Sequence, residues 1–529
     1  MSPSTWPSIP ALLVDAALRH ADRVAVRDGA TSLTYAQLDD ATRTFAAALV
    51  GSGIEPGDRV AIWCGNSAEW IVAALGTFAA GAVLVPVNTR FKGGEAAEIV
   101  ARSGARVLVT VTEFLGTDYV AMLHSAAAEL PALETIVVAH GPATGTGAAW
   151  SDFVAGVTPG ARAEVERRVA ALGPEDRSDI LFTSGTTGAP KGVVMTHGRT
   201  LSVATDWVAM TGLAAGDVYL MVNPYFHMFG LKAGILASVA AGATMLPEPV
   251  FDADRALARV AAERVTVLPG APTLYQSVLD HPARAARDIS SLRVAVTGAA
   301  DIPVELIRRI QDELPFSTVV AGYGLTEAGT ATATGKGDDA EAVATTVGRA
   351  RPGFELRIAG GGGTTAAAGE AGEVMLRGPS VMAGYLDDAA ATAKVLSADG
   401  WLRTGDLGTV DAAGRLRIVG RVKDMFIIGG FNAYPAEIEN ALLRHPAIRQ
   451  AAVIGVPDQR LGEVGMAFVV GDDLSGDEVI AWSRDQMANY KVPRVVEVVD
   501  ELPLNATGKV VKDALRERAR AGRAPSTPA

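Results

Sequence analysis

The sequence is short of cysteine and of net positive charge, and each shortage excludes a class of function. One cysteine, Cys64, occurs in 529 residues, so the chain cannot close a disulfide within itself. We expect Cys64 to lie in a buried strand, in a protein of the reducing cytoplasm. The net charge of −12 argues against general binding of nucleic acid or anionic lipid, because both require a basic surface that neutralises phosphates.

A long uninterrupted apolar run is missing as well. The segment 70–87, WIVAALGTFAAGAVLVPV, comes nearest to a membrane span, but Gly76, Gly81 and Pro86 interrupt it. Its change from Ala-rich to Val-rich predicts a buried helix that turns at Gly81 into a buried strand. The N-terminal segment has no basic region followed by a long apolar core, so we expect neither a secretory signal nor a membrane span.

The composition that remains is that of a large globular protein. Apolar residues make up 49% and charged residues 20%, and the length suggests several compact units. Helical stretches alternate with Val/Ile/Leu runs from about residue 34, which predicts parallel sheets covered by helices. Short alternating strands after about residue 345 predict an antiparallel region. We therefore predict an α/β fold with a large N-terminal domain (1–421) of parallel-sheet-rich subdomains plus an antiparallel region, and a small mobile α+β C-terminal domain (422–529).

A loop rich in small and hydroxyl residues is the most unusual local feature. LFTSGTTGAPKGVVMTH (181–197) places glycines, hydroxyls and Lys191 between a predicted buried strand and a predicted helix, 198–210. Glycines let backbone N–H groups approach an anion, and hydroxyls and an ammonium add donors and charge. The pattern differs from the Walker loop because Pro190 and Gly192 flank the lysine. It predicts a polyphosphate site, with a solvated turn as the alternative.

Six motifs in order resemble those of the adenylate-forming enzymes, the superfamily of acyl-CoA synthetases, adenylation domains and beetle luciferases. They are SGTTGAPKG (184–192), NPYFHMFG (223–230), GYGLTEAG (322–329), DGWLRTGDLG (399–408), GRVKDMFIIGGFNAYPAEIE (420–439) and PLNATGKV (503–510). The resemblance covers most of the chain. It implies an enzyme that joins a carboxylic acid to AMP from ATP with Mg²⁺, and then passes the acyl group to an acceptor.

The resemblance also implies a set of site residues. It assigns contacts with the nucleotide, its phosphates or CoA to Thr183, Ser184, Gly185, Thr186, Thr187, Gly188, Lys191, Gly298, Tyr323, Thr326, Asp406, Arg421, Gly429, Gly430 and Lys509. Glu327 would be the magnesium ligand, since Mg²⁺ prefers hard oxygen donors. Tyr323 would stack on adenine, with a core aromatic as the alternative, and Asp406 would accept hydrogen bonds from the ribose, with a surface Asp–Arg pair as the alternative.

Catalytic roles fall on Lys509, His227, Thr326 and Glu327. By resemblance, Lys509 enters the active site during adenylation, where an ammonium can bridge the carboxylate and the α-phosphate. His227 would lie near the substrate carboxylate, although a histidine between aromatic residues is often a satisfied core histidine. The acyl pocket is expected to include His227, Gly230, Lys232, Thr297, Gly298 and Gly322, while Lys232 could also be a surface helix residue.

The acyl acceptor and the acid substrate are predicted from more local sequence resemblances. His227 stands where amino-acid-activating relatives have an aspartate, and Ile427 replaces a lysine of the luciferases, so CoA is the expected acceptor. Segments 223–248, 429–442 and 451–470 resemble actinobacterial ligases that activate the bicyclic propanoate of steroid-ring degradation. The alternative substrate is a medium-chain fatty acid. The alternative functions are a stand-alone amide synthetase and a catalytically inactive nucleotide-binding regulator. The protein could also form a homodimer.

Overall fold

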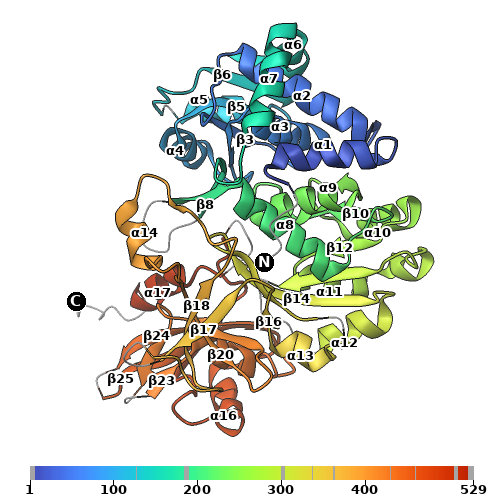
Figure 1. Cartoon of the computed structure of the whole chain (residues 1–529). Coiled ribbons are helices and arrows are strands. Elements are labelled where there is room, and N and C mark those ends of the chain that lie inside the picture. Colours follow the sequence, from blue (N-terminus) through green and yellow to red (C-terminus); the bar gives the residue numbers. More distant parts are fainter. Residues whose placement is uncertain are drawn as a thin grey trace. The chain divides into compact units, whose positions relative to one another are not determined.

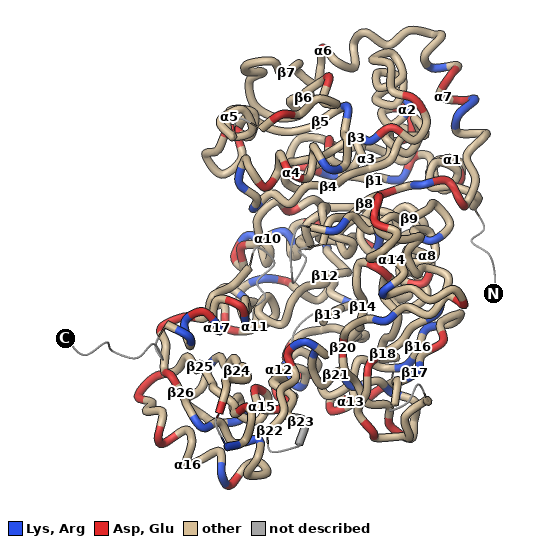
Figure 2. The backbone as a smooth tube through the Cα atoms, turned by 90° about the vertical axis from the view of Figure 1, so that its left-hand side faces the viewer, with Lys and Arg blue, Asp and Glu red and all other residues tan. Residues whose placement is uncertain are grey.

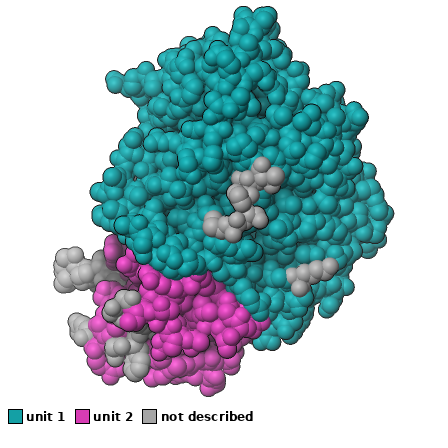
Figure 3. All heavy atoms as spheres, viewed as in Figure 1, with its two compact units in different colours: residues 1–355, 376–402 teal, residues 356–375, 403–529 magenta. Residues whose placement is uncertain are grey.

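The computed structural model describes residues 6–126, 128–183, 190–298, 304–335, 337–360, 364–428, 431–458, 460–505 and 510–521. Its elements follow one another along the chain as drawn in Figure 1. Two compact units are present (Figure 3): unit 1 comprises residues 1–355 and 376–402, and unit 2 comprises residues 356–375 and 403–529. In each unit, Lys and Arg are interspersed with Asp and Glu along the backbone (Figure 2).

An eight-stranded sheet in unit 1 carries the strand that leads into the predicted phosphate loop. Its order is β19 (Gly384–Tyr385), β9 (Lys191–Thr196), β8 (Arg177–Thr183), β4 (Val83–Pro86), β3 (Arg59–Trp63), β5 (Ala105–Val111), β6 (Thr135–His140) and β7 (Gly147–Ala149). Strands β8 to β7 pair in parallel, whereas β9 runs antiparallel to both β8 and β19. The parallel strands confirm the predicted crossover architecture.

A nine-stranded sheet in unit 1 carries the predicted adenine- and magnesium-binding motif. Its order is β16 (Arg349–Ala350), β15 (Gly329–Ala333), β14 (Thr318–Leu325), β13 (Val294–Gly298), β12 (Val267–Pro269), β10 (Val218–Met221), β11 (Thr244–Pro247), β1 (Val24–Asp28) and β2 (Thr31–Thr34). The six strands from β14 to β1 pair in parallel. Antiparallel hairpins close both ends of the sheet.

Helices connect these strands. They are α1 (Ile9–Arg19), α2 (Tyr35–Gly51), α3 (Ala68–Ala79), α4 (Gly93–Ser103), α5 (Tyr119–Ser125), α6 (Trp150–Ala155), α7 (Pro159–Ala171), α8 (His197–Thr211), the π-helix η1 (Phe229–Leu236), α9 (Ala237–Ala241), α10 (Ala253–Glu263), α11 (Pro272–Asp280), the 3₁₀ helix η2 (Pro282–Ala286), α12 (Val304–Glu313), α13 (Ala340–Thr345) and α14 (Ala389–Val395). Helix α2 begins at a capping box in which the Thr34 hydroxyl accepts from Gln37 N and the Gln37 amide oxygen accepts from Thr34 N.

The apolar segment 70–87 folds as the sequence predicts. Helix α3 is buried along its length, the chain turns at Gly81 with φ of +76°, and β4 follows as a fully buried strand. Cys64 is buried too, but it lies one residue beyond β3 and not within a strand, and burial raises the pKa of its thiol. Over the part of the chain that the structure describes, no helix combines the length and the apolar character that a membrane crossing requires.

Unit 2 contains two smaller sheets. The four-stranded sheet has the order β17 (Glu355–Ala359), β18 (Gly372–Arg377), β20 (Leu402–Val410) and β21 (Leu416–Arg421). The other sheet combines β23 (Phe431–Ala433), β22 (Phe426–Ile428), β25 (Gly462–Gly471) and β24 (Ile448–Asp458), with β26 (Val495–Val498) paired to β25. Its helices are α15 (Pro435–Leu442), α16 (Gly476–Gln486) and α17 (Lys512–Ala521).

The α/β fold class is confirmed, with mixed sheets in a large unit and a smaller α+β unit. The antiparallel pairing of β20 with β21 agrees with the short alternating strands expected after residue 345. These strands belong to unit 2, whereas the sequence groups them with the N-terminal domain. A division by compactness does not test a boundary between domains, so the boundary at 421/422 stays a prediction.

Candidate active site

The predicted phosphate loop joins two antiparallel strands. Thr183 ends β8 and Lys191 begins β9, and the two residues are paired in register. The predicted helix, 198–210, is observed as α8 from His197, but the strand β9, which sequence reasoning did not predict, lies between the loop and this helix. The physical reason is the run 192–196, GVVMT, which is buried and β-branched and therefore suits a central strand. Ser184, Gly185, Thr186, Thr187 and Gly188 lie outside the described residues.

The two described ends of this loop are held in place. The Thr183 hydroxyl donates to the carbonyl oxygen of Lys191 at 3.4 Å. The Lys191 ammonium lies 5.0 Å from the centroid of the Tyr385 ring, which is a favourable cation–π separation. Lys191 is therefore kept beside an aromatic ring at the start of β9, with its charge partly exposed.

Thr326 and Glu327 lie in the tight turn between β14 and β15. Ala328 N donates to Leu325 O at 3.0 Å to close the turn. The Tyr385 hydroxyl donates to Glu327 Oε1 at 3.0 Å, and burial together with the Glu327 charge raises the pKa of Tyr385. Tyr385 thus contacts both the predicted magnesium ligand and the predicted phosphate-binding lysine. It lies in none of the six motifs, so sequence reasoning missed it.

Glycines bring two strands together next to this turn. Gly298 ends β13 and pairs with Gly322 of β14. A Cβ at Gly298 would lie 2.7 Å from the Gly322 carbonyl oxygen, which only glycine avoids. Tyr323 follows in β14 and is half-buried, so it is not a fully buried core aromatic. Gly298 of β13, Tyr323 of β14 and Thr326 in the turn after β14 therefore belong to two adjacent strands and one turn of the same sheet.

The His227 segment, residues 223–230, follows β10. The His227 side chain is exposed, so the alternative of a core histidine is wrong. Its Nδ1 accepts from Phe229 N at 3.2 Å, and its carbonyl accepts from Leu231 N at 3.0 Å. A Cβ at Gly230 would lie 2.2 Å from Pro224 O, so only glycine fits at the first turn of η1.

Asn66 fixes the start of the His227 segment. This buried amide donates to the carbonyl oxygens of Met221 at 2.9 Å, Asn223 at 3.0 Å and Glu248 at 3.3 Å, and it accepts from Tyr225 N at 2.9 Å. Every polar atom of the amide is therefore engaged with this part of the backbone. Sequence reasoning missed Asn66 because 157 residues separate it from Asn223.

Lys232 is not a surface residue. Its side chain is completely buried in η1 and forms an ion pair with Asp179 of β8. The surface-helix alternative is therefore wrong, and the position of Lys232 as a pocket wall stays a prediction.

Unit 2 holds the predicted ribose-binding pair. Asp406 of β20 and Arg421 of β21 are cross-strand partners, and Arg421 Nε lies 3.0 Å from Asp406 Oδ1. The Asp406 side chain is 8% exposed and that of Arg421 is 48% exposed. Burial lowers the pKa of the nearby Lys423. Gly429, Gly430 and Lys509 lie outside the described residues.

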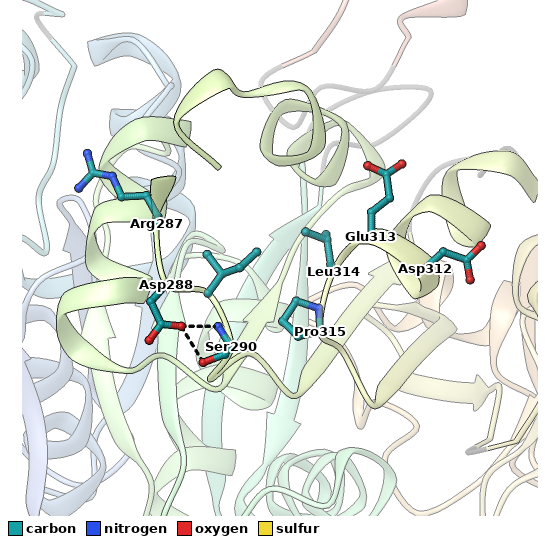
Figure 4. A pocket seen from close by; sticks show the side chains of 8 residues that line it. Arg287, Asp288, Ser290, Asp312, Glu313, Leu314 and Pro315 are labelled. Carbon is teal, nitrogen blue, oxygen red and sulfur yellow. Dashed lines mark hydrogen bonds between the residues drawn. The ribbon is translucent and has the colours of Figure 1, made fainter. Parts of the chain in front are cut away.

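Among the described residues, no group of three or more His, Cys, Asp or Glu side chains could hold a metal ion. Residues 287–290 and 312–315 line a depression of about 470 Å³. Figure 4 shows its side chains, among which Asp288 accepts hydrogen bonds from Ser290. None of the predicted site residues lines this depression.

The fold and these motifs are those of an adenylate-forming enzyme. The chain belongs to the AMP-binding enzyme family: residues 13–386 match the model of that family, and residues 437–509 match the model of the AMP-binding enzyme C-terminal domain. The resemblance inferred from the six motifs is thereby confirmed.

Two curated relatives match nearly the whole chain. Both are methyl-dioxo-octahydro-indenyl propanoyl:CoA ligases. The one from Mycobacterium tuberculosis is 51% identical, with 96% of this chain and 98% of the relative covered. The one from Rhodococcus jostii is 48% identical, with 97% of this chain and 99% of the relative covered.

Solved structures share the fold. The anthranilate CoA ligase AuaEII with anthranoyl-AMP has a TM-score of 0.87 at 28% identity, over 98% of each chain. The amide bond synthetase McbA from Marinactinospora thermotolerans has a TM-score of 0.82 at 29% identity, over 96% of this chain and 99% of that chain. In sequence, this chain is thus much more similar to the two CoA ligases, at about 50% identity, than to the amide synthetase, at 29% identity.

Proposed function

We propose that the protein activates a bicyclic, steroid-derived propanoate with ATP and transfers the acyl group to CoA. The single observation that carries the proposal is the near-full-length match, at about half identity, to two ligases named for a methylated bicyclic propanoate. The chain is an AMP-forming acyl-CoA ligase that takes an acid, ATP and CoA as substrates. The other named acid, a medium-chain fatty acid, has weaker support.

The reaction proceeds in two balanced steps. A carboxylate oxygen attacks the α-phosphorus of ATP, the bond to the bridging oxygen of the β-phosphate breaks, and pyrophosphate leaves with that electron pair. The CoA sulfur, having lost its proton, then attacks the acyl carbon and AMP leaves. Both steps concentrate negative charge, so donors that are already fixed at that place stabilise the transition state.

The described residues suit the first step. Lys191 and the Thr183 hydroxyl bind phosphate oxygens, Tyr323 stacks on adenine, Thr326 donates to the α-phosphate, and Asp406 with Arg421 holds the ribose. Glu327 provides a carboxylate for Mg²⁺, and substrate phosphates would supply further oxygen ligands, as is common for this ion. When bound, the ion neutralises phosphate charge. Gly298 and His227 face the acid. For the second step, the resemblance assigns the pantetheine arm to Gly429 and Gly430, which lie outside the described residues.

A substrate panel tests the proposal. Purified protein with ATP, Mg²⁺ and CoA would receive the bicyclic propanoate, simple alicyclic propanoates or medium-chain fatty acids, with mass spectrometry of the products. The acyl-CoA of the bicyclic acid should form with the highest kcat/KM. A medium-chain acid that exceeds every alicyclic propanoate would overturn the substrate assignment. Preferential amide formation when an amine competes with CoA would favour the amide synthetase instead.

Lys509→Ala separates the two steps. We propose that the Lys509 ammonium stabilises charge only during adenylation, so the variant should form the adenylate about 10²–10³-fold more slowly, as for the loss of one fixed donor. Thioester formation from supplied acyl-adenylate should stay near the parent rate. The measurement is pyrophosphate release for the first step and CoA-thioester formation for the second. Equal losses in both steps would contradict this role.

The compartment and the assembly are further parts of the proposal. A cytoplasmic location agrees with a single buried thiol, since a reducing compartment keeps thiols unpaired. Sedimentation of the purified protein would test a homodimer.

A further inference from the structure

One ion pair in unit 1 is completely buried. Lys232 Nζ lies 2.8 Å from Asp179 Oδ1, and both side chains have 0% exposed area. The other carboxylate oxygen, Oδ2, accepts from Ser178 Oγ at 2.7 Å and from Thr200 Oγ1 at 2.6 Å. Burial lowers the pKa of Lys232, and the Asp179 charge opposes that effect. Elements β8, α8 and η1 therefore meet at one polar cluster inside an apolar core.

Stability alone does not explain this pair. Removing two charges from water costs several kcal/mol for each ion, and replacement of buried pairs by apolar residues is often neutral or stabilising. Among the described residues, Asp179 is the single ion-pair partner of the Lys232 ammonium. A costly pair with so few supporting hydrogen bonds is better explained by a requirement for one particular arrangement of the chain.

The Asp179 side of the pair is rigid. Asp179 lies in the middle of β8, where it pairs with Leu84 of β4 on one side and with Met195 of β9 on the other. Four residues later, β8 ends at Thr183, the described edge of the phosphate loop. Strand pairing on both sides keeps β8 in place whether or not the ion pair exists.

The Lys232 side is irregular and close in sequence to His227. Lys232 lies in the π-helix η1, a rare geometry that is frequently found at functional sites. The residue before it, Leu231, donates its N–H to the His227 carbonyl, and Phe229 donates to the His227 ring. A shift of η1 toward regular α-helical geometry would therefore move both the backbone and the ring of His227.

We propose that the Lys232–Asp179 pair fastens η1 to β8 and thereby positions the His227 segment for the acid substrate. Lys232 and Asp179 are positioning residues, because they act through His227. The inference rests on the proposed acid activation, in which His227 faces the acid. It predicts that loss of the pair raises KM for the acid while KM for ATP stays unchanged, since β8 and the phosphate loop keep their sheet pairing.

The test compares single and double substitutions of similar volume. Lys232→Met leaves the Asp179 charge buried without its cation and should lower Tm clearly. The double variant Asp179→Asn with Lys232→Met removes both charges and should recover much of that loss. Its KM for the acid should nevertheless be raised about tenfold to a hundredfold, the usual penalty for a misplaced positioning group, with KM for ATP within about twofold of the parent. Acid-dependent ATP–pyrophosphate exchange gives both constants.

The control uses another ion pair of unit 1, in which the arginine side chain is 4% exposed and the aspartate side chain is 23% exposed. Arg351 lies 2.7 Å from Asp206 of α8, and neither residue belongs to η1 or β8. The double variant Asp206→Asn with Arg351→Met should change Tm without a selective change in KM for the acid. The proposal is overturned if the double variant at Asp179 and Lys232 has the parent KM for the acid, or if its two KM values rise equally. A wild-type protein without acid-dependent exchange would instead refute the proposed function.

Discussion

The two units each contain an ion pair of about the same length, set in opposite surroundings. In unit 1, Lys232 and Asp179 are 2.8 Å apart and fully buried. In unit 2, Arg421 and Asp406 are 3.0 Å apart, and the arginine is about half exposed. The first pair cannot exchange its partner for a ligand without opening the core. The second can, because water or a ligand already reaches one of its members.

The difference in burial suggests different roles for the two ion pairs: the buried pair positions chain segments, and the half-exposed pair binds a ligand. A pair with one half-exposed member is partly screened by solvent, so opening it for a ligand costs less than opening a fully buried pair. A buried pair fixes the elements that it joins, since breaking it leaves an uncompensated charge. We therefore expect substitutions at Asp406 to act on ATP and substitutions at Lys232 to act on the acid.

The largest effect is expected at Asp406. Asp406→Ala removes an acceptor for two ribose hydroxyls, and hydrogen bonds to a charged group contribute roughly 1.5–3 kcal/mol each, so kcat/KM for ATP should fall about 10³-fold. The free energy of unfolding should change little by comparison, because the Arg421 partner is half exposed. Acid-saturated pyrophosphate exchange at varied ATP measures the first quantity, and urea unfolding measures the second.

A nearby pair supplies the control for Asp406. Asp411 and Arg415 are 2.7 Å apart near the turn between β20 and β21, and both are partly exposed. Asp411→Ala removes the same kind of pair from the same hairpin without touching a predicted nucleotide contact. Its kcat/KM for ATP should stay within about twofold of the parent, as expected for a surface pair. A comparable loss in both variants would mean that the hairpin, and not the ribose contact, is responsible.

His197 is a buried histidine of unit 1, and it tests whether burial keeps such a ring neutral. Its Nδ1 accepts from Ile9 N at 3.3 Å, and burial lowers the pKa of the ring to about 4, although Asp179 and Asp176 oppose that shift. The neutral ring is therefore the folded form. Stability is complete above the unfolded pKa of about 6.5 and declines as pH falls toward 4.

This decline is large enough to measure. With a folded pKa of about 4, the wild type should lose about 2 kcal/mol of unfolding free energy between pH 7.5 and 5 through this group. His197→Asn keeps an acceptor for the Ile9 N–H. It should be less stable than the wild type at pH 7.5, but its free energy of unfolding should depend less on pH. Urea unfolding at both pH values gives the comparison. Parallel profiles for the two proteins would refute the assignment.

Sequence reasoning reached the fold and the motif residues because both depend on local patterns. Alternating helices and apolar strands predicted the parallel sheets, and TGD with GRVK predicted Asp406 and Arg421, which prove to be cross-strand partners. Contacts between distant segments were out of reach. Asn66, Asp179 and Tyr385 act through tertiary contacts and lie outside every motif, and the strand β9 was taken for part of a strand–helix connection.

The smallest effect is expected at an ion pair of which both members are partly exposed. His140 Nε2 lies 2.8 Å from Glu69 Oε2, with side chains 46% and 25% exposed, and contact with this carboxylate raises the pKa of His140. A raised histidine pKa means that the stabilisation is complete below the unfolded pKa of 6.5 and is lost as pH rises through the folded value. After solvent screening, we expect about 0.5 kcal/mol. His140→Gln should therefore be less stable than the wild type at pH 6, and the difference should shrink at pH 8.5. A stability difference that grows with pH would contradict this expectation. It would mean that the folded protein favours the neutral ring of His140, as it does for His197.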